Sequence, residues 1–160
     1  MSFLKRFTRL QDKAVSPNPE PSAPDTSAAL EPCVAHKVLI VDDEKTVRVA
    51  LGRIIEFGLP YCVIEFAAYG EAAVAAFSQS HPKIVIMDLK LPSISGVQAF
   101  HDIMDLCAEK RWQPPCVIFC TGYSPGDEVK NIVKGHPDHQ LIMKPVKPET
   151  LIDAVKKRLD

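Results

Sequence analysis

An α/β fold built on a parallel sheet is predicted for residues 36–160 of this 160-residue chain from three observations. Short apolar runs alternate with longer amphipathic stretches five times along these residues. Runs such as residues 38–41 and 84–87 carry no polar side chain, which is typical of strands buried on both faces. The stretches between them repeat apolar residues at helical spacing. This alternation favours a parallel sheet covered by helices on both faces.

The expected elements follow one another in a regular order. Strands are predicted at residues 37–41, 61–67, 84–88, 116–120 and 141–143. Helices are predicted between residue 44 and Gly58, at 71–80, at 95–110, at 127–134 and from Pro148 onwards. Pro148 fits a first helical turn, where its missing N–H costs nothing. Right-handed crossovers then favour a flavodoxin-like (βα)5 doubly wound sheet with strand order 2-1-3-4-5.

Residues 1–35 have a different composition. Residues 14–35 contain five prolines among Ser, Ala and Thr, which predicts a disordered tether. Residues 1–13 carry four basic residues against one acid and hold apolar residues at helical spacing: Phe3, Leu4, Phe7 and Leu10. We expect a short amphipathic helix that folds on an anionic membrane or in a groove of a partner protein. A disordered start with chance spacing is the alternative.

Composition narrows the class of protein. Lys and Arg total 19 against 20 for Asp and Glu, so bulk charge gives no case for nucleic-acid binding. No apolar run approaches the length of a membrane span, and basic residues interrupt the N-terminal apolar residues, so a cytoplasmic location is expected. The five cysteines form no C-x-x-C pair, and Cys116 and Cys120 are expected to pack as small hydrophobes.

Polar residues follow the predicted strands at their carboxyl ends. The first strand leads into Asp42 and Asp43, the third ends at Asp88, the fourth leads into Thr121 and the fifth into Lys144. Carboxyl ends of parallel strands share one edge of the sheet, so these groups should converge. Two carboxylates about 4 Å apart repel by roughly 4 kcal/mol at an effective dielectric of ~20. The cluster must raise a pKa or bind a cation, and Mg²⁺ suits such hard oxygen ligands.

These groups suggest phosphoryl transfer. A carboxylate such as Asp88 can act as a phosphoryl-accepting nucleophile, while Lys144 and the Thr121 hydroxyl hold phosphoryl oxygens. Each residue also has a simpler explanation: Asp42 or Asp43 as a helix N-cap, Thr121 as a turn residue, Lys144 as a surface lysine. The presence of one such residue at each expected strand end favours the joint site.

Four motifs resemble those of response-regulator receiver domains, the phospho-accepting half of bacterial two-component signalling. They are LIVDDE, IMDLKLPSISG, FCTG and IMKP, and the resemblance covers residues 36–160. It implies that Asp88 is the phosphorylated aspartate, that Thr121 is the switch hydroxyl and that Lys144 binds the phosphate. One position departs from the family, because Leu141 stands where a Tyr or Phe is usual. The inward flip of an aromatic ring, which is usual in the family, cannot occur at this position.

The resemblance also implies a metal site. Asp43 matches the direct Mg²⁺ ligand, Asp42 acts on the metal largely through water, and the backbone carbonyl of Lys90 matches the third protein ligand. Together with Asp88 these groups would hold Mg²⁺, with Mn²⁺ as a substitute.

A stand-alone, CheY-like receiver with an N-terminal extension is the resulting functional expectation. It would take its phosphoryl group from a sensor histidine kinase or a histidine phosphotransferase, as in a phosphorelay. With no output domain of its own, it would signal by binding a downstream protein partner. It would be no enzyme beyond catalysing its own Mg²⁺-dependent phosphorylation and dephosphorylation.

Other functions fit the same fold less well. A flavin- or nucleotide-binding module needs a phosphate-cradling loop after the first strand, where this chain has Asp-Asp-Glu. A haloacid-dehalogenase-type phosphatase places two aspartates two residues apart at that strand, which DDEKT does not match. A degenerate receiver that acts without phosphorylation is the main rival. Such receivers usually lose an acidic position or the lysine, and this chain keeps them.

Deleting residues 1–13 is expected to abolish association with anionic vesicles or with a partner protein, because it removes the apolar stripe and the positive charge together. Thirteen residues are near or below the length of a stable isolated helix, so the segment should fold only on a surface. Phosphoryl acceptance at Asp88 should not change. Co-sedimentation with anionic and with neutral vesicles measures the difference. Full-length protein that neither pellets nor changes location on deletion would contradict the prediction.

Overall fold

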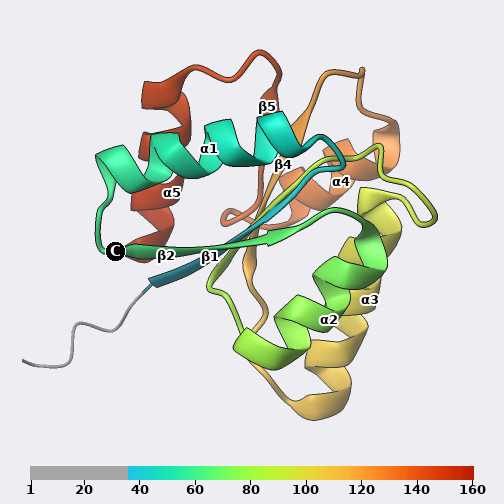
Figure 1. Cartoon of the computed structure of the whole chain (residues 1–160). Coiled ribbons are helices and arrows are strands. Elements are labelled where there is room, and N and C mark those ends of the chain that lie inside the picture. The colour runs from blue at the N-terminus through green and yellow to red at the C-terminus, as the bar shows by residue number, and fades with distance from the viewer. Residues whose placement is uncertain (1–35) are drawn as a thin grey trace, which may run out of the picture. The chain divides into compact units, whose positions relative to one another are not determined.

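The structure is a computed structural model that describes residues 36–160. It shows a five-stranded parallel sheet with helices on both sides (Figure 1). The helix predicted at residues 1–13 and the tether predicted at residues 14–35 lie outside the described residues.

Strands and helices alternate along the whole described part. The strands are β1 (His36–Val41), β2 (Cys62–Ala67), β3 (Ile84–Met87), β4 (Cys116–Thr121) and β5 (Gln140–Met143). The helices are α1 (Lys45–Gly58), α2 (Gly70–Ser80), α3 (Gly96–Lys110), α4 (Asp127–Gly135) and α5 (Pro148–Leu159). All paired strands are parallel, in the order β2-β1-β3-β4-β5. The predicted (βα)5 topology is confirmed.

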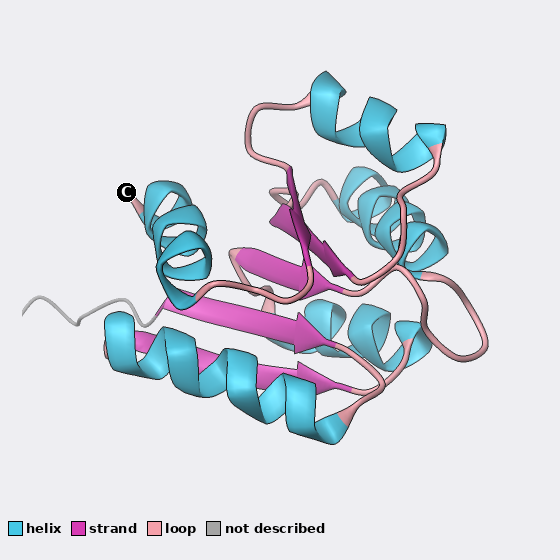
Figure 2. Cartoon of the chain, turned by 90° about the horizontal axis from the view of Figure 1, so that it is seen from above, coloured by secondary structure: helices cyan, strands magenta, loops and turns pink. Residues whose placement is uncertain are grey.

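The sheet forms the middle layer between two sets of helices (Figure 2). Val38 and Ile40 of β1 point to the side where α1 and α5 pack, while Leu39 and Val41 point to the side of α2, α3 and α4. This alternation explains the unbroken apolar runs, since every position of a central strand meets a core. Each fully buried aliphatic side chain contributes about 1.5–3 kcal/mol.

The helix ends follow local chemistry. Ser95 is the N-cap of α3, and its hydroxyl accepts a hydrogen bond from the backbone N–H of Gln98 at 3.1 Å. Pro148 stands in the first turn of α5, as predicted. The helix α1 ends at Gly58, the residue that the sequence indicated.

The cysteines of the described part belong to the core rather than to a redox site. Cys62, Cys107, Cys116 and Cys120 form no disulfide. Burial raises the pKa of the Cys120 thiol to about 12, which keeps it protonated and unreactive at neutral pH. Separately, none of the helices within residues 36–160 has the length and apolar character needed to span a bilayer.

Gly96 holds the loop between β3 and α3 close to Asp88. The backbone N–H of Gly96 donates to the carbonyl of Leu89 at 2.9 Å. A Cβ at position 96 would lie 2.0 Å from the carbonyl oxygen of Asp88, so only glycine fits there without backbone movement. The start of α3 is therefore packed against the backbone that presents the Asp88 carboxylate.

Gly96→Ala is expected to lower the free energy of unfolding by about 3 kcal/mol, the upper end of the range for overpacked sites, because the clash is with backbone. Gly135→Ala is the matched control: its methyl group meets nothing within 4 Å, and no glycine of the described part has a positive φ. It should be neutral or stabilising by about 0.4–1 kcal/mol. Urea denaturation measures both. Equal urea midpoints for the two variants would contradict the prediction and show that the loop between β3 and α3 accommodates the methyl group.

Candidate functional site

The polar residues predicted at the strand ends do meet at one edge of the sheet. Asp42 follows β1, Asp88 follows β3, Thr121 ends β4 and Lys144 follows β5. Among the residues that the structure describes, the buried polar or charged ones are Asp42, Asp88 and Thr121, with exposed fractions of 1%, 7% and 0%. Burying a carboxylate costs several kcal/mol unless it is paired. The buried polar side chains of the described residues are concentrated at this edge of the sheet.

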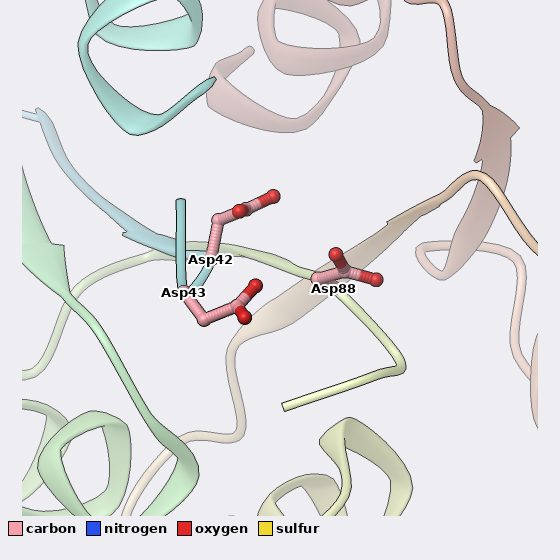
Figure 3. Close-up of side chains that lie close together, drawn as sticks. All are labelled: Asp42, Asp43 and Asp88. Carbon is pink, nitrogen blue, oxygen red and sulfur yellow. The ribbon is translucent and has the colours of Figure 1, made fainter. Parts of the chain in front are cut away.

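Three carboxylates form an acidic cluster (Figure 3). One oxygen from each of Asp42, Asp43 and Asp88 can be chosen so that the three lie within 4.8 Å of one another. Asp43 is exposed to solvent while the other two are buried. Carboxylate oxygens that converge at a solvent-accessible edge fit a hard cation such as Mg²⁺, which keeps part of its water shell.

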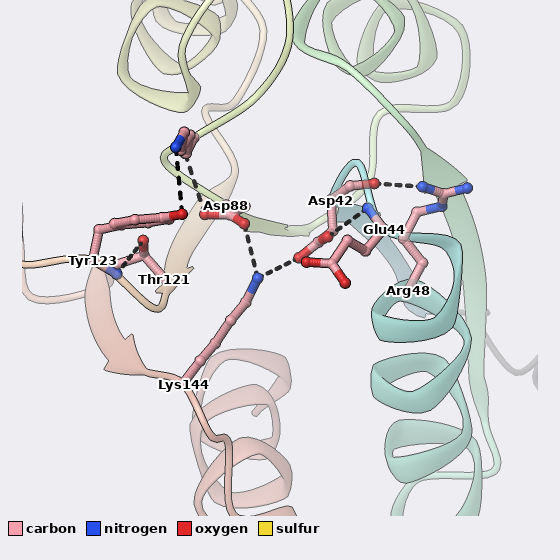
Figure 4. A network of polar contacts seen from close by, with 8 residues as sticks. Asp42, Glu44, Arg48, Asp88, Thr121, Tyr123 and Lys144 are labelled. Carbon is pink, nitrogen blue, oxygen red and sulfur yellow. Dashed lines mark hydrogen bonds and ion pairs between the residues drawn. The ribbon is translucent and has the colours of Figure 1, made fainter.

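Lys144 bridges the two buried carboxylates (Figure 4). Its Nζ lies 2.5 Å from Asp42 Oδ2 and 2.8 Å from Asp88 Oδ2. Its backbone N–H donates to the carbonyl of Thr121 at 2.8 Å, which fixes the start of the β5–α5 loop. Burial alone lowers the pKa of the Lys144 ammonium, but the hydrogen bonds to Asp42 and Asp88 outweigh burial and raise it overall. The lysine is therefore charged at neutral pH, and it offsets part of the carboxylate repulsion.

Asp42 is held by the loop that leads into α1. Its Oδ1 accepts a hydrogen bond from the backbone N–H of Glu44 at 2.9 Å. Glu44 itself occupies the N-cap position of α1 and makes no side-chain cap, so neither aspartate acts as the conventional N-cap. Nη1 of Arg48 donates to the carbonyl oxygen of Asp42 at 2.5 Å, which ties the first turn of α1 to the site.

The backbone N–H of Lys90 lies beside Asp88. It donates to Asp88 Oδ1 at 3.2 Å. Oδ1 and Oδ2 of Asp88 thus have different partners, Lys90 on one side and Lys144 on the other. The role of the Lys90 carbonyl as a metal ligand stays a prediction.

Thr121 lies at the predicted edge and also forms a turn. Its Oγ1 accepts a hydrogen bond from the backbone N–H of Tyr123 at 3.2 Å, so the turn explanation applies, and its role toward a phosphoryl group stays a prediction. A hydroxyl that accepts one bond keeps its own proton for donation. Leu141, at the position where related domains usually have an aromatic, is half-buried against the core on the α2, α3 and α4 side.

Two contacts at the site have no counterpart in the prediction from sequence. Nζ of Lys90 lies 4.6 Å from the centre of the Tyr123 ring and 3.3 Å from its hydroxyl, so the loops after β3 and β4 touch across the mouth of the site. An exposed cation–π contact contributes about 0.5–1 kcal/mol. Arg48 is the other residue that the sequence did not single out. Its place in the first turn after an acidic loop was the available signal.

Comparison with known proteins identifies the class. Residues 38–156 match the family model of the response regulator receiver domain, and the chain belongs to this family. The receiver fold, with five parallel strands in the order 2-1-3-4-5, is therefore confirmed by both the topology and the family.

Individual relatives show the same domain in different settings. The chain is 31% identical to the chemotaxis protein CheY of Thermotoga maritima, over 76% of this chain and 95% of that protein. It is 36% identical to the positive alginate biosynthesis regulatory protein of Pseudomonas aeruginosa, over 75% of this chain but only 46% of that protein. The chain thus spans about half the length of the first two curated relatives that it matches, at 46% and 49%.

A solved structure supports the fold. The crystal structure of a CheY-like response regulator receiver domain protein from Methanospirillum hungatei aligns with a TM-score of 0.66 at 27% identity. The alignment covers 79% of this chain and 94% of that one.

Lys144→Ala is expected to fold and still bind Mg²⁺, because it removes a cation that competes for the same carboxylates. Without metal, the variant should lose about 2 kcal/mol of stability, less than the ~3–5 of a fully buried pair, because Lys144 is 21% exposed. Saturating Mg²⁺ should restore part of this loss by mass action. Calorimetric titration and urea denaturation measure the two effects.

Lys147→Ala, at an exposed lysine three residues on, is the control and should change neither quantity. The raised pKa of Lys144 sets the pH range of its contribution in the wild type. The stabilisation is fully present below the ordinary lysine value of 10.5 and is lost as pH rises through the higher value of the folded state. A collapse of Mg²⁺ affinity in Lys144→Ala would instead make Lys144 part of the metal site's framework.

Proposed function

We propose that this chain is a phospho-accepting response regulator in which Asp88 receives a phosphoryl group from a phosphohistidine. The observation that carries the proposal is the pairing of buried Asp88 with the Lys144 ammonium at the strand-end edge where Asp42 and Asp43 also converge. A buried ion pair is often no more stabilising than apolar residues of similar volume, so its presence beside an acidic cluster favours a chemical role. Family membership supports the same role.

The transfer needs a nucleophile, a cation and donors for the phosphoryl oxygens. An oxygen of Asp88 attacks the phosphorus, a P–O bond forms and the P–N bond to the donor histidine breaks; the donor ring, protonated on its other nitrogen, leaves as neutral imidazole. Asp42, Asp43, Asp88 and the Lys90 carbonyl would hold Mg²⁺ or Mn²⁺, which neutralises charge on the phosphoryl group when bound. The protein's own residues provide the rest of the site.

Lys144 is suited to follow the phosphoryl group. Its ammonium has three N–H donors, and the unphosphorylated site engages two of them with Asp42 and Asp88. Once Asp88 becomes an acyl phosphate, the ammonium would bind a phosphoryl oxygen in a charge-assisted bond. The site thus keeps a positive group ready before the reaction.

Thr121 provides a route from the site to the surface. If its hydroxyl turns to donate to a phosphoryl oxygen, its bond with the Tyr123 N–H is altered, because one oxygen serves both. Tyr123 in turn contacts Lys90 and precedes α4, so the β4–α4 loop would move. A downstream protein partner that reads α4, β5 and α5 would detect this change.

The phosphodonor is expected to dock beside Lys144. An apolar groove of about 360 Å³ lies between α1 and the β5–α5 loop. Five residues of α1 line one side, Thr46, Val47, Ala50, Leu51 and Ile54, and Lys144, Pro145 and Val146 line the other. An amphipathic helix of a sensor histidine kinase or histidine phosphotransferase fits such a groove and would bring its phosphohistidine to the site edge.

Asp88→Asn is expected to abolish phosphorylation, because an amide cannot act as the nucleophile. Wild type incubated with acetyl phosphate and Mg²⁺ should gain the mass of one phosphoryl group, and removal of Mg²⁺ should prevent the gain. Asp105→Asn, at an exposed aspartate of α3, is the matched control and should label like wild type. Intact-mass spectrometry measures all three. Equal labelling of the Asp88→Asn protein would contradict the assignment of Asp88 as the phosphoryl acceptor. If no protein were labelled, the result would favour a receiver that acts without phosphorylation.

A further inference from the structure

A second cleft, lined by several charged side chains, lies at the opposite end of the strands from Asp88. It has a volume of about 590 Å³, within the range of small-molecule sites. Its walls are the residue before β3, the loop that enters β4, the α4–β5 loop and the last turn of α5, and Met104 of α3 also lines it. These walls share no residue with the site around Asp88.

Positive charge predominates in this cleft. Lys83, Lys157 and Arg158 line it, against the carboxylates of Asp138 and Asp160. Asp138 Oδ2 lies 3.8 Å from Nδ1 of His136, so this carboxylate already has a nearby cationic partner whenever the imidazole is protonated. The side chains therefore leave a net positive cleft.

Two of the cations are fixed in place by backbone carbonyls. Nζ of Lys83 donates to the carbonyl of Leu159 at 2.9 Å. Arg158 donates through Nε to the carbonyl of Asp138 at 2.5 Å and through Nη1 to that of Ala154 at 2.7 Å. The carboxyl end of a helix normally repels anions, and these bonds offset that field at the end of α5. Lysine has three donors and the guanidinium five, so both retain N–H groups for a ligand.

Two imidazoles add further donors. Nδ1 of His139 accepts from the backbone N–H of Val117 at 3.1 Å, and Nδ1 of His136 accepts from that of Asp138 at 3.3 Å. Because Nδ1 is the acceptor in each neutral ring, Nε2 carries the proton and can donate. The two ring centres are 4.8 Å apart. Burial, and then the nearby His136, lower the pKa of His139, while the carboxylate of Asp138 opposes them.

We propose that this cleft binds a small phosphorylated organic molecule, with the phosphate held by Lys157, Arg158 and Lys83. Fixed guanidinium and ammonium donors are the groups that proteins use for phosphate. The volume of the cleft exceeds the needs of a lone phosphate ion and leaves room beside Pro114, Pro115 and Met104 for an apolar part of the ligand. The ligand would bind without a metal, in contrast to the site at Asp88.

The test uses the full-length protein in EDTA, so that the carboxylate site holds no metal. Amide resonances are followed while AMP or inorganic phosphate is added, with sodium chloride keeping the ionic strength constant. We expect shifts in residues 113–117, 136–140 and 157–160 and none at Asp42 or Asp88. Tighter binding of AMP than of phosphate would show that the cleft also recognises the organic part. Equal binding would assign the site to phosphate alone.

A matched pair of lysines tests the contact. Lys157→Ala should weaken AMP binding about tenfold, as expected for the loss of one charged hydrogen bond. Lys156→Ala, at the adjacent exposed lysine outside the cleft, should bind like wild type. Bound AMP should also raise the pH at which His139 titrates, because linkage is reciprocal. Shifts that are absent, shifts confined to the Asp88 edge, or equal losses in the two lysine variants would overturn the proposal.

Discussion

The ammonium of Lys144 between Asp42 and Asp88 is the interaction on which the site depends. Two buried carboxylates at one sheet edge repel each other, and a folded protein must supply a cation or give up a charge. Here the cation comes from the residue after β5, a strand separated from β3 by β4, so a long side chain has to cross the end of β4. The strand order and the length of a lysine side chain together make this contact available. The backbone bond from Lys144 to the Thr121 carbonyl then fixes where that side chain starts.

Much of this arrangement could be predicted from the sequence, because it rests on regularities of the backbone. Alternating apolar runs and amphipathic stretches specify a parallel sheet, and a parallel sheet collects its strand ends at one edge. That argument alone brought Asp42, Asp43, Asp88, Thr121 and Lys144 together. The contacts of Arg48 and Tyr123 could not be predicted, since they depend on loop conformation and rotamers that carry no period. The need for glycine at position 96 could not be predicted either. A Cβ there would meet the backbone carbonyl of Asp88, and a backbone carbonyl leaves no signal in the sequence because every residue has one.

The two edges of the sheet have different chemistry. The carboxyl ends of the strands carry carboxylates that could hold a metal ion, whereas Lys83, Lys157 and Arg158 lie near the amino ends. The strand β4 joins them directly, with Thr121 at one end and Val117, whose amide is bonded to His139, near the other. Five of the six residues of β4 are buried, so both ends belong to one closely packed strand. The inner strand that ends at Thr121 therefore also borders the cleft.

The position of β5 has a consequence for how the protein loses its structure. It is an edge strand of four residues, bonded only to β4, and Met143 at its end is 46% exposed. Hydrogen bonds at such an edge open more readily than those of β1 or β3, because less apolar surface has to be uncovered. As β5 frays on warming, the lysine that follows it withdraws while the acids are still held by the intact centre. In this partly unfolded state the acidic cluster would lack the ammonium of Lys144. Dissolved cations would therefore stabilise the protein most at the temperature where β5 begins to separate from β4.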